Sequence, residues 1–215
     1  MSKNLVLFGG WLRGERSYQR FVKISPVDCN INVLSYETMM PRGRSDEFAQ
    51  NVTQFLKKNN LSKVSIMGHS LGGSLALKFA YHYPDKVEHL YLVDSEGIYG
   101  HETLPQLIRN FIRSNLNRQG SRDMKNISDL LKVFKKPILH FKLAHFAHYV
   151  DLQKEANSLK VPTTILWGEK DHLTPLWQGQ RLHELIKGSK LIVLKDMDHD
   201  WILHSPELFW QNVTE

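Results

Sequence analysis

Ser70 stands between two glycines in the run Gly68-His69-Ser70-Leu71-Gly72, a spacing suited to nucleophilic chemistry. The β-branched and apolar residues at 63–67 predict a strand before it, and the residues at 74–80 predict a helix after it. A serine at the tip of such a tight turn takes a strained backbone conformation that exposes its hydroxyl, while the glycines leave room for neighbouring backbone. The sequence therefore predicts a nucleophilic serine at the end of a strand.

A serine hydroxyl is a weak nucleophile at neutral pH, so it needs a histidine to take its proton and a carboxylate to orient that histidine. Two later strand-and-loop units offer these groups. The apolar run at 191–194 precedes a polar loop that contains His199, the candidate base. The run at 163–167 precedes a loop that contains Asp171, the candidate acid. Serine, acid and histidine thus follow one another in the chain, each just after a predicted strand.

With these residues, the chain resembles the α/β-hydrolase superfamily of serine esterases and lipases, as a compact member with a helical cap. The resemblance implies an α/β fold with a mostly parallel sheet flanked by helices. It also implies an oxyanion hole formed by the backbone N–H groups of Trp11 and Leu71. Gly10 matches the glycine of the family's oxyanion loop, whereas Gly9 stands where the family commonly has histidine.

Predicted strands and helices alternate along the chain except over residues 98–160, where three helical periodicities follow one another. We therefore expect residues 1–97 and 161–215 to form the hydrolase core and residues 98–160 to be inserted as a helical cap. The cap helices are expected around 104–112, 124–134 and 138–152. In the core, a strand is expected at 33–37 and helices near 17–24, 45–59, 74–82, 176–186 and 206–212.

The candidate acid has one competitor in the sequence. Asp94 also ends a predicted strand, over 89–94, and its carboxylate could orient the base instead of Asp171. The resemblance favours Asp171, because the family more often places its acid after the penultimate strand. Three further carboxylates lie too close in sequence to the candidate base and are expected to cap its loop or face solvent: Asp196, Asp198 and Asp200.

The other histidines and the cysteine are assigned no catalytic role. The side chain of His69 should point away from the serine hydroxyl, so we expect it to pack or to support the catalytic residues. The single cysteine, Cys29, excludes an intrachain disulfide and is expected to be a packing residue. Three histidines have helical spacing, but no carboxylate or cysteine completes a recognisable metal site with them: His140, His145 and His148. No metal and no organic cofactor is expected.

Composition fits a soluble single domain, with 215 residues of which 41% are hydrophobic. No apolar run approaches the roughly 20 residues that span a bilayer, so we expect a cytoplasmic protein without stable membrane insertion. The net charge is +6, and basic residues are concentrated between 102 and 142. This pattern is typical of a solvent-exposed helix face, although it would also attract an anionic substrate or a lipid surface. No motif indicates a nucleic-acid partner, and the oligomeric state is left open.

The predicted function is hydrolysis of a carboxylic ester of a small or medium apolar molecule through an acyl-enzyme on Ser70. The same triad also serves thioesterases, aminopeptidases and carbon–carbon bond hydrolases. A non-catalytic or single-turnover ligand receptor on the same fold is an alternative of a different class. A receptor should react once and stop, so a turnover assay separates it from an enzyme.

Overall fold

The computed structural model describes residues 4–44, 47–99 and 134–213. Its strands span Asn4–Phe8 (β1), Asn30–Leu34 (β2), Val64–His69 (β3), Val87–Val93 (β4), Thr163–Gly168 (β5) and Lys190–Leu194 (β6). They form one sheet in the order β2-β1-β3-β4-β5-β6, and every neighbouring pair is parallel. The α/β fold predicted from the sequence is confirmed.

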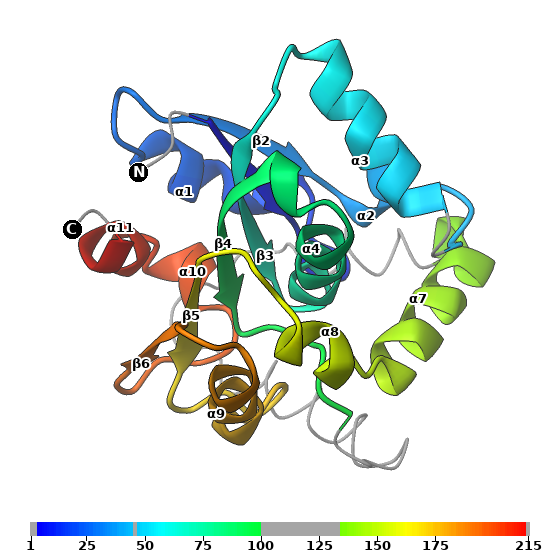
Figure 1. Cartoon of the computed structure of the whole chain (residues 1–215). Helices are drawn as coiled ribbons and strands as arrows, with labels where there is room; N and C mark the ends of the chain where they lie inside the picture. Colours follow the sequence, from blue (N-terminus) through cyan, green and yellow to red (C-terminus); the bar gives the residue numbers. More distant parts are fainter. Residues whose placement is uncertain (1–3, 45–46, 100–133, 214–215) are drawn as a thin grey trace.

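Helices cover both faces of this sheet (Figure 1). The α-helices span Gln19–Lys23 (α1), Tyr36–Met39 (α2), Glu47–Lys58 (α3), Leu71–His82 (α4), Pro137–Tyr149 (α7), Gln153–Asn157 (α8), Leu176–Leu185 (α9), Trp201–His204 (α10) and Glu207–Val213 (α11). Two short 3-10 helices lie at Glu15–Tyr18 (η1) and Pro84–Lys86 (η2). One apolar cluster joins α3, α4, α8 and α9 to the sheet, and a second joins α1, α10 and α11 to its other face.

The alternation of side chains along β1 explains how one strand serves both clusters. Val6 and Phe8 belong to the cluster around α4, whereas Leu5 and Leu7 belong to the cluster around α1 and α11. All four side chains are fully buried. Successive side chains of a strand point to opposite faces of its sheet, so a continuous apolar run indicates a strand buried on both sides.

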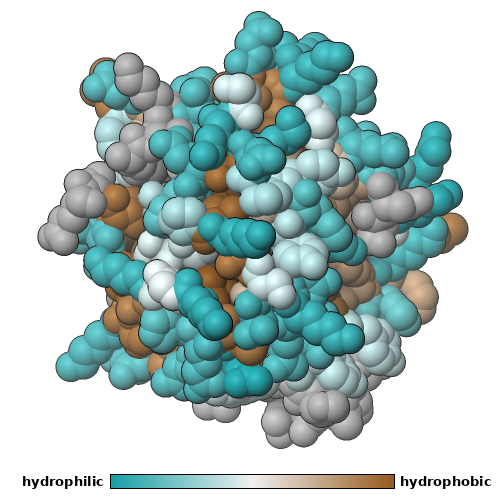
Figure 2. Space-filling view, in the orientation of Figure 1, coloured by the Kyte–Doolittle hydropathy of each residue, from teal (hydrophilic) through white to brown (hydrophobic). Residues whose placement is uncertain are grey.

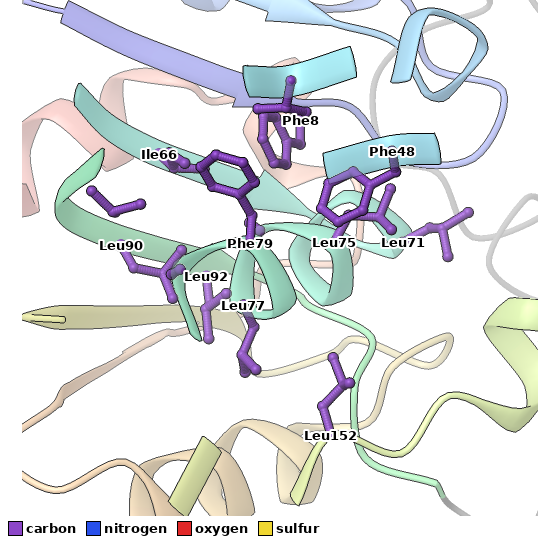
Figure 3. Close-up of a cluster of buried hydrophobic side chains, with 14 of the residues drawn as sticks. Phe8, Phe48, Ile66, Leu71, Leu75, Leu77, Phe79, Leu90, Leu92 and Leu152 are labelled. Carbon is purple, nitrogen blue, oxygen red and sulfur yellow. The ribbon is translucent and has the colours of Figure 1, made fainter. Parts of the chain in front are cut away.

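Helix α4 follows the candidate nucleophile and lies in the centre of the larger cluster (Figure 3). Phe79 of α4 meets Phe8 of β1 and Phe48 of α3 edge to face, with ring centroids 6.3 and 6.2 Å apart. Its first turns are buried on all sides, from Leu71 to Leu77. A helix packed in this way holds its N-terminus, and the residue before it, in a fixed place.

The strand order places the topological switch point of the sheet between β1 and β3. The connection that leaves β1 passes through α1 on one face, whereas the connection that leaves β3 enters α4 on the other face. In open parallel sheets, ligands bind outside the carboxyl ends of the strands at such a switch point. The loop after β1 and the turn after β3 are therefore the expected walls of a site.

Two of the elements that differ from the sequence prediction lie close to the candidate site or follow β2. The strand expected at 33–37 ends at Leu34, because the Ser35 hydroxyl accepts a hydrogen bond from Thr38 N at 3.3 Å and caps α2. Helix α4 begins directly after Ser70, earlier than the expected residue 74, although Gly72 and Gly73 are weak helix formers. Close packing around these glycines outweighs their low helix propensity.

In the segment predicted as a cap, the structure describes α7 and α8, and α7 lies beyond α8 at the side of the sheet (Figure 1). The helices expected around 104–112 and 124–134 lie outside the described residues, apart from Phe134. The division into core and cap thus stays a prediction. Among the residues described, no helix has the length and apolar character to cross a membrane. Hydrophilic side chains predominate on the face shown in Figure 2.

Candidate active site

Ser70 occupies the sharp turn between β3 and α4 that the sequence predicts. Its backbone has φ 54° and ψ −125°, in the left-handed half of the map that residues with a Cβ rarely adopt. Two glycines make the turn possible. A Cβ on Gly68 would lie 2.5 Å from the Cα of Gly73, and one on Gly72 would lie 2.1 Å from the carbonyl oxygen of Phe8. The strain is therefore fixed by packing on both sides of the serine.

The loop after β1 lies directly against this serine. A Cβ added to Gly10 would be 3.2 Å from the Cβ of Ser70, so only glycine fits between loop and nucleophile without displacement. Trp11 follows Gly10, and Leu71 is the first residue of α4. The structure thus brings the loop that carries Trp11 against Ser70, which Leu71 follows directly at the switch point of the sheet.

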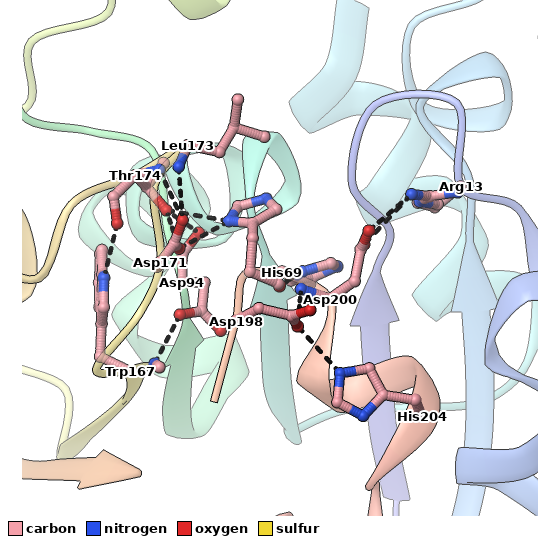
Figure 4. A network of polar contacts seen from close by, with 12 residues as sticks. Arg13, His69, Asp94, Trp167, Asp171, Leu173, Thr174, Asp198, Asp200 and His204 are labelled. Atoms are coloured by element: carbon pink, nitrogen blue, oxygen red, sulfur yellow. Dashed lines mark hydrogen bonds and ion pairs between the residues drawn. The ribbon is translucent and has the colours of Figure 1, made fainter. Parts of the chain in front are cut away.

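Asp171 and His199 come together from two different loops, after β5 and after β6. His199 Nδ1 lies 2.7 Å from Asp171 Oδ2, and both residues are buried, with 4% of their surface exposed (Figure 4). Burial opposes the charged imidazole, but the Asp171 carboxylate outweighs burial and raises the pKa of His199 above its ordinary 6.5. Among the described residues no hydrogen bond joins Ser70 to His199. Such contacts are often longer in unliganded sites than in the reacting complex.

The Asp171 carboxylate is held by its own loop as well as by the histidine. Its Oδ1 accepts hydrogen bonds from Leu173 N at 2.7 Å and Thr174 N at 2.9 Å. Its Oδ2 accepts from the Thr174 hydroxyl at 2.6 Å, and that hydroxyl lies 3.1 Å from His199 Nδ1. These contacts fix the plane of the carboxylate, so the ring of His199 meets an oriented acceptor.

Asp94, the competing acid, lies at the end of β4 beside Asp171 but does not bind the histidine (Figure 4). Its Oδ1 accepts a hydrogen bond from Gly168 N at 2.8 Å, whereas its buried Oδ2 has no partner among the described residues. Burial, and next the negative charge of Asp171, raise the pKa of Asp94 well above its ordinary range. The geometry favours Asp171 as the partner of the candidate base.

A family model described as the alpha/beta hydrolase fold matches residues 25–137, which is more than half of the chain. The chain belongs to this family. Among curated proteins, a 2-hydroxy-6-oxononadienedioate/2-hydroxy-6-oxononatrienedioate hydrolase of Escherichia coli O81 (strain ED1a) is 26% identical over 221 residues. This alignment covers 88% of the chain and 76% of the relative. A similarly named hydrolase of Pseudomonas putida is also 26% identical over the same shares of the two chains.

Solved structures share the fold of this α/β hydrolase at low identity. The esterase EaEST of Exiguobacterium antarcticum superposes with a TM-score of 0.79 at 17% identity, covering 99% of this chain and 91% of the esterase. A serine hydrolase involved in carbazole degradation, CarC, also gives a TM-score of 0.79 at 17% identity, with 99% and 90% covered. At such identities the likeness establishes the architecture alone.

Several buried contacts around the triad of the hydrolase were not expected from the sequence. Asp200, expected to cap its loop or face solvent, is 7% exposed and lies 2.9 Å from Arg13 Nη2. That expectation is wrong because Arg13, from the loop after β1, supplies a partly buried counter-charge. Asp198 does cap its loop, since its Oδ1 accepts from the backbone N of Asp200 at 3.1 Å. His69 lies in a hydrogen-bonded network with Tyr18, 51 residues away.

One cavity in the described part of the hydrolase lies away from the candidate triad. It has a volume of about 500 Å³ and lies between α7, α8 and the loop after α2, with Phe146 and Lys142 among its lining residues. Neither Ser70 nor His199 lines it. In the described part of the chain, no group of three histidine, cysteine or acidic side chains could hold a metal ion.

Proposed function

We propose that this α/β hydrolase is a serine hydrolase that cleaves carboxylic esters through an acyl-enzyme on Ser70. The buried contact of 2.7 Å between His199 Nδ1 and Asp171 Oδ2 carries the proposal, because it fixes which imidazole nitrogen is left for the nucleophile. With Nδ1 donating to the carboxylate, Nε2 of the neutral ring is free of a proton and can accept one. The strained turn then presents the serine as the group to be deprotonated.

The reaction would proceed in two halves. Ser70 Oγ attacks the carbonyl carbon of the ester while its proton moves to His199 Nε2, and a tetrahedral oxyanion forms. The imidazolium returns this proton to the leaving alcohol as the carbon–oxygen bond breaks, which leaves an acyl-enzyme. Water then attacks the acyl carbon, His199 takes the water proton, and the acid leaves as Ser70 recovers the proton. Asp171 stabilises the imidazolium in both halves.

The proposed oxyanion hole consists of the backbone N–H groups of Trp11 and Leu71. The N-terminus of α4 supports the second donor, because the aligned peptide dipoles of a helix favour negative charge at that end. In other enzymes, each donor placed where negative charge develops lowers the activation barrier by about 3 kcal/mol. The contact between Gly10 and Ser70 supports this assignment, since it holds the loop of Trp11 next to the reacting atom.

Hydrolysis of a carbon–carbon bond is the second candidate, favoured by the names of the curated relatives. A 2-hydroxy-6-oxo dienedioate carries no ester, so its hydrolysis must break a bond between carbons, next to the ketone. Such a substrate carries two negative charges. The excess of basic residues between 102 and 142 in the sequence would attract it.

Turnover of two substrate classes tests the proposal. The wild type, Ser70→Ala and the control Ser65→Ala would be compared on p-nitrophenyl esters from acetate to palmitate and on a 2-hydroxy-6-oxo dienedioate. Ser65 suits the control because it is a buried serine of the same strand, β3. Multiple turnovers of an ester that Ser70→Ala abolishes and Ser65→Ala retains would support the esterase.

Three other results would contradict the esterase. Turnover of the dienedioate alone would favour the carbon–carbon hydrolase. A single stoichiometric burst that stops would favour a receptor. Unchanged ester turnover in Ser70→Ala would refute the role of the serine altogether.

A further inference from the structure

A chain of buried hydrogen bonds runs from the loop after β1 to the backbone of the candidate base. Gly10 N donates to the Tyr18 hydroxyl oxygen at 2.9 Å, and this hydroxyl lies 2.8 Å from His69 Nδ1. His69 Nε2 in turn lies 3.0 Å from the carbonyl oxygen of His199. Tyr18 is fully buried and His69 is 1% exposed, so water does not compete for these contacts.

The partners fix the direction of every hydrogen bond in this chain. A carbonyl oxygen only accepts, so His69 Nε2 must carry a proton. Burial, and next the neighbouring His199, lower the pKa of His69 to about 4, so its ring is neutral and Nδ1 is an acceptor. Burial also raises the pKa of Tyr18, which keeps its hydroxyl protonated. Tyr18 therefore donates to His69, and His69 donates to His199.

The position of His199 beside the sheet explains what this series of hydrogen bonds can do. The base follows β6, the edge strand, whereas the nucleophile follows β3, with β4 and β5 between them. Asp171, after β5, holds the side chain of His199 from one side. His69, in β3, holds its backbone carbonyl from the other side. His199 is thus held at two points, its side chain by the loop after β5 and its backbone carbonyl by β3.

A second connection runs parallel to the first. Arg13 Nη2 contacts both carboxylate oxygens of Asp200, at 2.9 and 3.2 Å. These side chains are only 15% and 10% exposed, so the ion pair is shielded from solvent. Both connections join the loop after β1, which carries the proposed oxyanion donor, to the loop that carries the base. Figure 4 shows the second of them, between Arg13 and Asp200.

We propose that Tyr18 and His69 are positioning residues that hold the oxyanion loop and the base loop in register across the sheet. The inference rests on the proposed function of Ser70 and His199. Tyr18 contacts the backbone of Gly10 and His69 contacts the backbone of His199, and the two side chains act through these groups. Attack and oxyanion stabilisation require both loops at once, so relative drift of the loops lowers the rate of the chemical step.

The first test removes one hydroxyl and keeps the ring. Tyr18→Phe preserves the edge-to-face contact with His69, whose ring centroid is 6.0 Å away, but leaves Gly10 N–H and His69 Nδ1 without this partner. With p-nitrophenyl acetate, kcat is expected to fall about tenfold with KM nearly unchanged. Amide hydrogen exchange, measured by mass spectrometry, is expected to quicken in the peptides covering residues 9–14 and 197–205.

Tyr91→Phe is the matched control, because Tyr91 lies in the same apolar cluster as Tyr18 but on β4, with its ring against Phe209 of α11. It should leave kcat and the exchange of both peptides as in the wild type. If Tyr18→Phe behaves like Tyr91→Phe in kcat and in exchange, the proposal is overturned. Exchange needs no substrate, so a wild type inactive on every ester would refute the proposed function while quickened exchange still supported the connection between the loops.

A pair of His69 variants provides an independent test at the other end of the chain. Glutamine can donate to the His199 carbonyl and accept from Tyr18, whereas leucine of similar volume can do neither. His69→Gln is expected to keep a kcat about tenfold above that of His69→Leu and slower exchange in the base loop. Equal kcat and equal exchange in the two variants would contradict a positioning role.

Discussion

Because His69 is buried and neutral, we predict that mild acid destabilises the protein through this one side chain. The fold lowers the pKa of His69 from 6.5 to about 4, so between these values the unfolded chain binds a proton that the folded chain excludes. Stability rises with pH wherever the unfolded state binds more protons. The contribution of His69 is therefore full above 6.5 and is lost as pH falls toward 4.

The size of this loss follows from the two pKa values. Between pH 7 and pH 5, the difference in proton binding amounts to about 2 kcal/mol of unfolding free energy. His199 acts in the opposite direction: its raised pKa gives stability that is present at low pH and is lost as pH rises through that pKa. The two histidines partly cancel in the wild type, so a variant that removes only His69 is needed to isolate its share.

Urea unfolding of the wild type and of His69→Gln, at pH 7 and at pH 5 and constant ionic strength, measures this share. Glutamine does not titrate, and the linkage of His199 remains in both proteins. The wild type should lose about 2 kcal/mol more than the variant over this interval. Equal losses in the two proteins would refute the argument that burial holds His69 neutral.

Other substitutions test the neighbouring assignments. Asp171→Asn should lower kcat by about 10⁴-fold with the fold retained, since asparagine cannot stabilise the imidazolium. Asp94→Asn alters a carboxyl group that accepts from Gly168 N and not from His199, and it should change kcat less than about threefold. A larger loss in Asp94→Asn would reverse the assignment of the acid. Because the pKa of His199 is raised above 6.5 and the base must be neutral, kcat/KM should fall with decreasing pH with a midpoint above 6.5, and a midpoint below 6.5 would contradict the pairing with Asp171. Gly73→Ala places a Cβ 2.1 Å from the hydroxyl oxygen of Ser95 and should abolish folding as measured by circular dichroism. In the control Gly14→Ala the new Cβ meets no atom within 4 Å, so this variant should melt like the wild type. Equal melting curves for the two variants would show that the turn can relax.

The sequence predicts the triad loops well because each is a local pattern. A run of buried residues, then a turn with Ser70, Asp171 or His199, is readable within about ten residues. The parallel sheet brings the ends of such strands to one edge, so chain order was enough to predict that acid and base would meet. The residues alone left Asp171 and Asp94 open, because both follow buried strands. The family resemblance favoured Asp171, and its contact with His199 agrees with that choice.

The supporting contacts could not be predicted, because they join residues far apart in the chain. Tyr18 and His69 are separated by 51 positions, and Arg13 and Asp200 by 187. Asp200 lies among polar residues in sequence, which is typical of a solvent-exposed loop, and only the approach of the loop after β1 buries it. No sequence pattern marks Thr174 either, although its hydroxyl contacts both Asp171 and His199.

The backbone of Ser70 has an evolutionary consequence. A residue with a Cβ held at φ 54° costs on the order of 1 kcal/mol or more, whereas glycine takes this conformation freely. Selection for stability alone would favour glycine over serine at this position. The presence of serine therefore indicates selection for something other than stability. In a lineage released from catalysis, glycine at position 70 would be among the first changes to spread, and it would mark the loss of the reaction before the fold itself decayed.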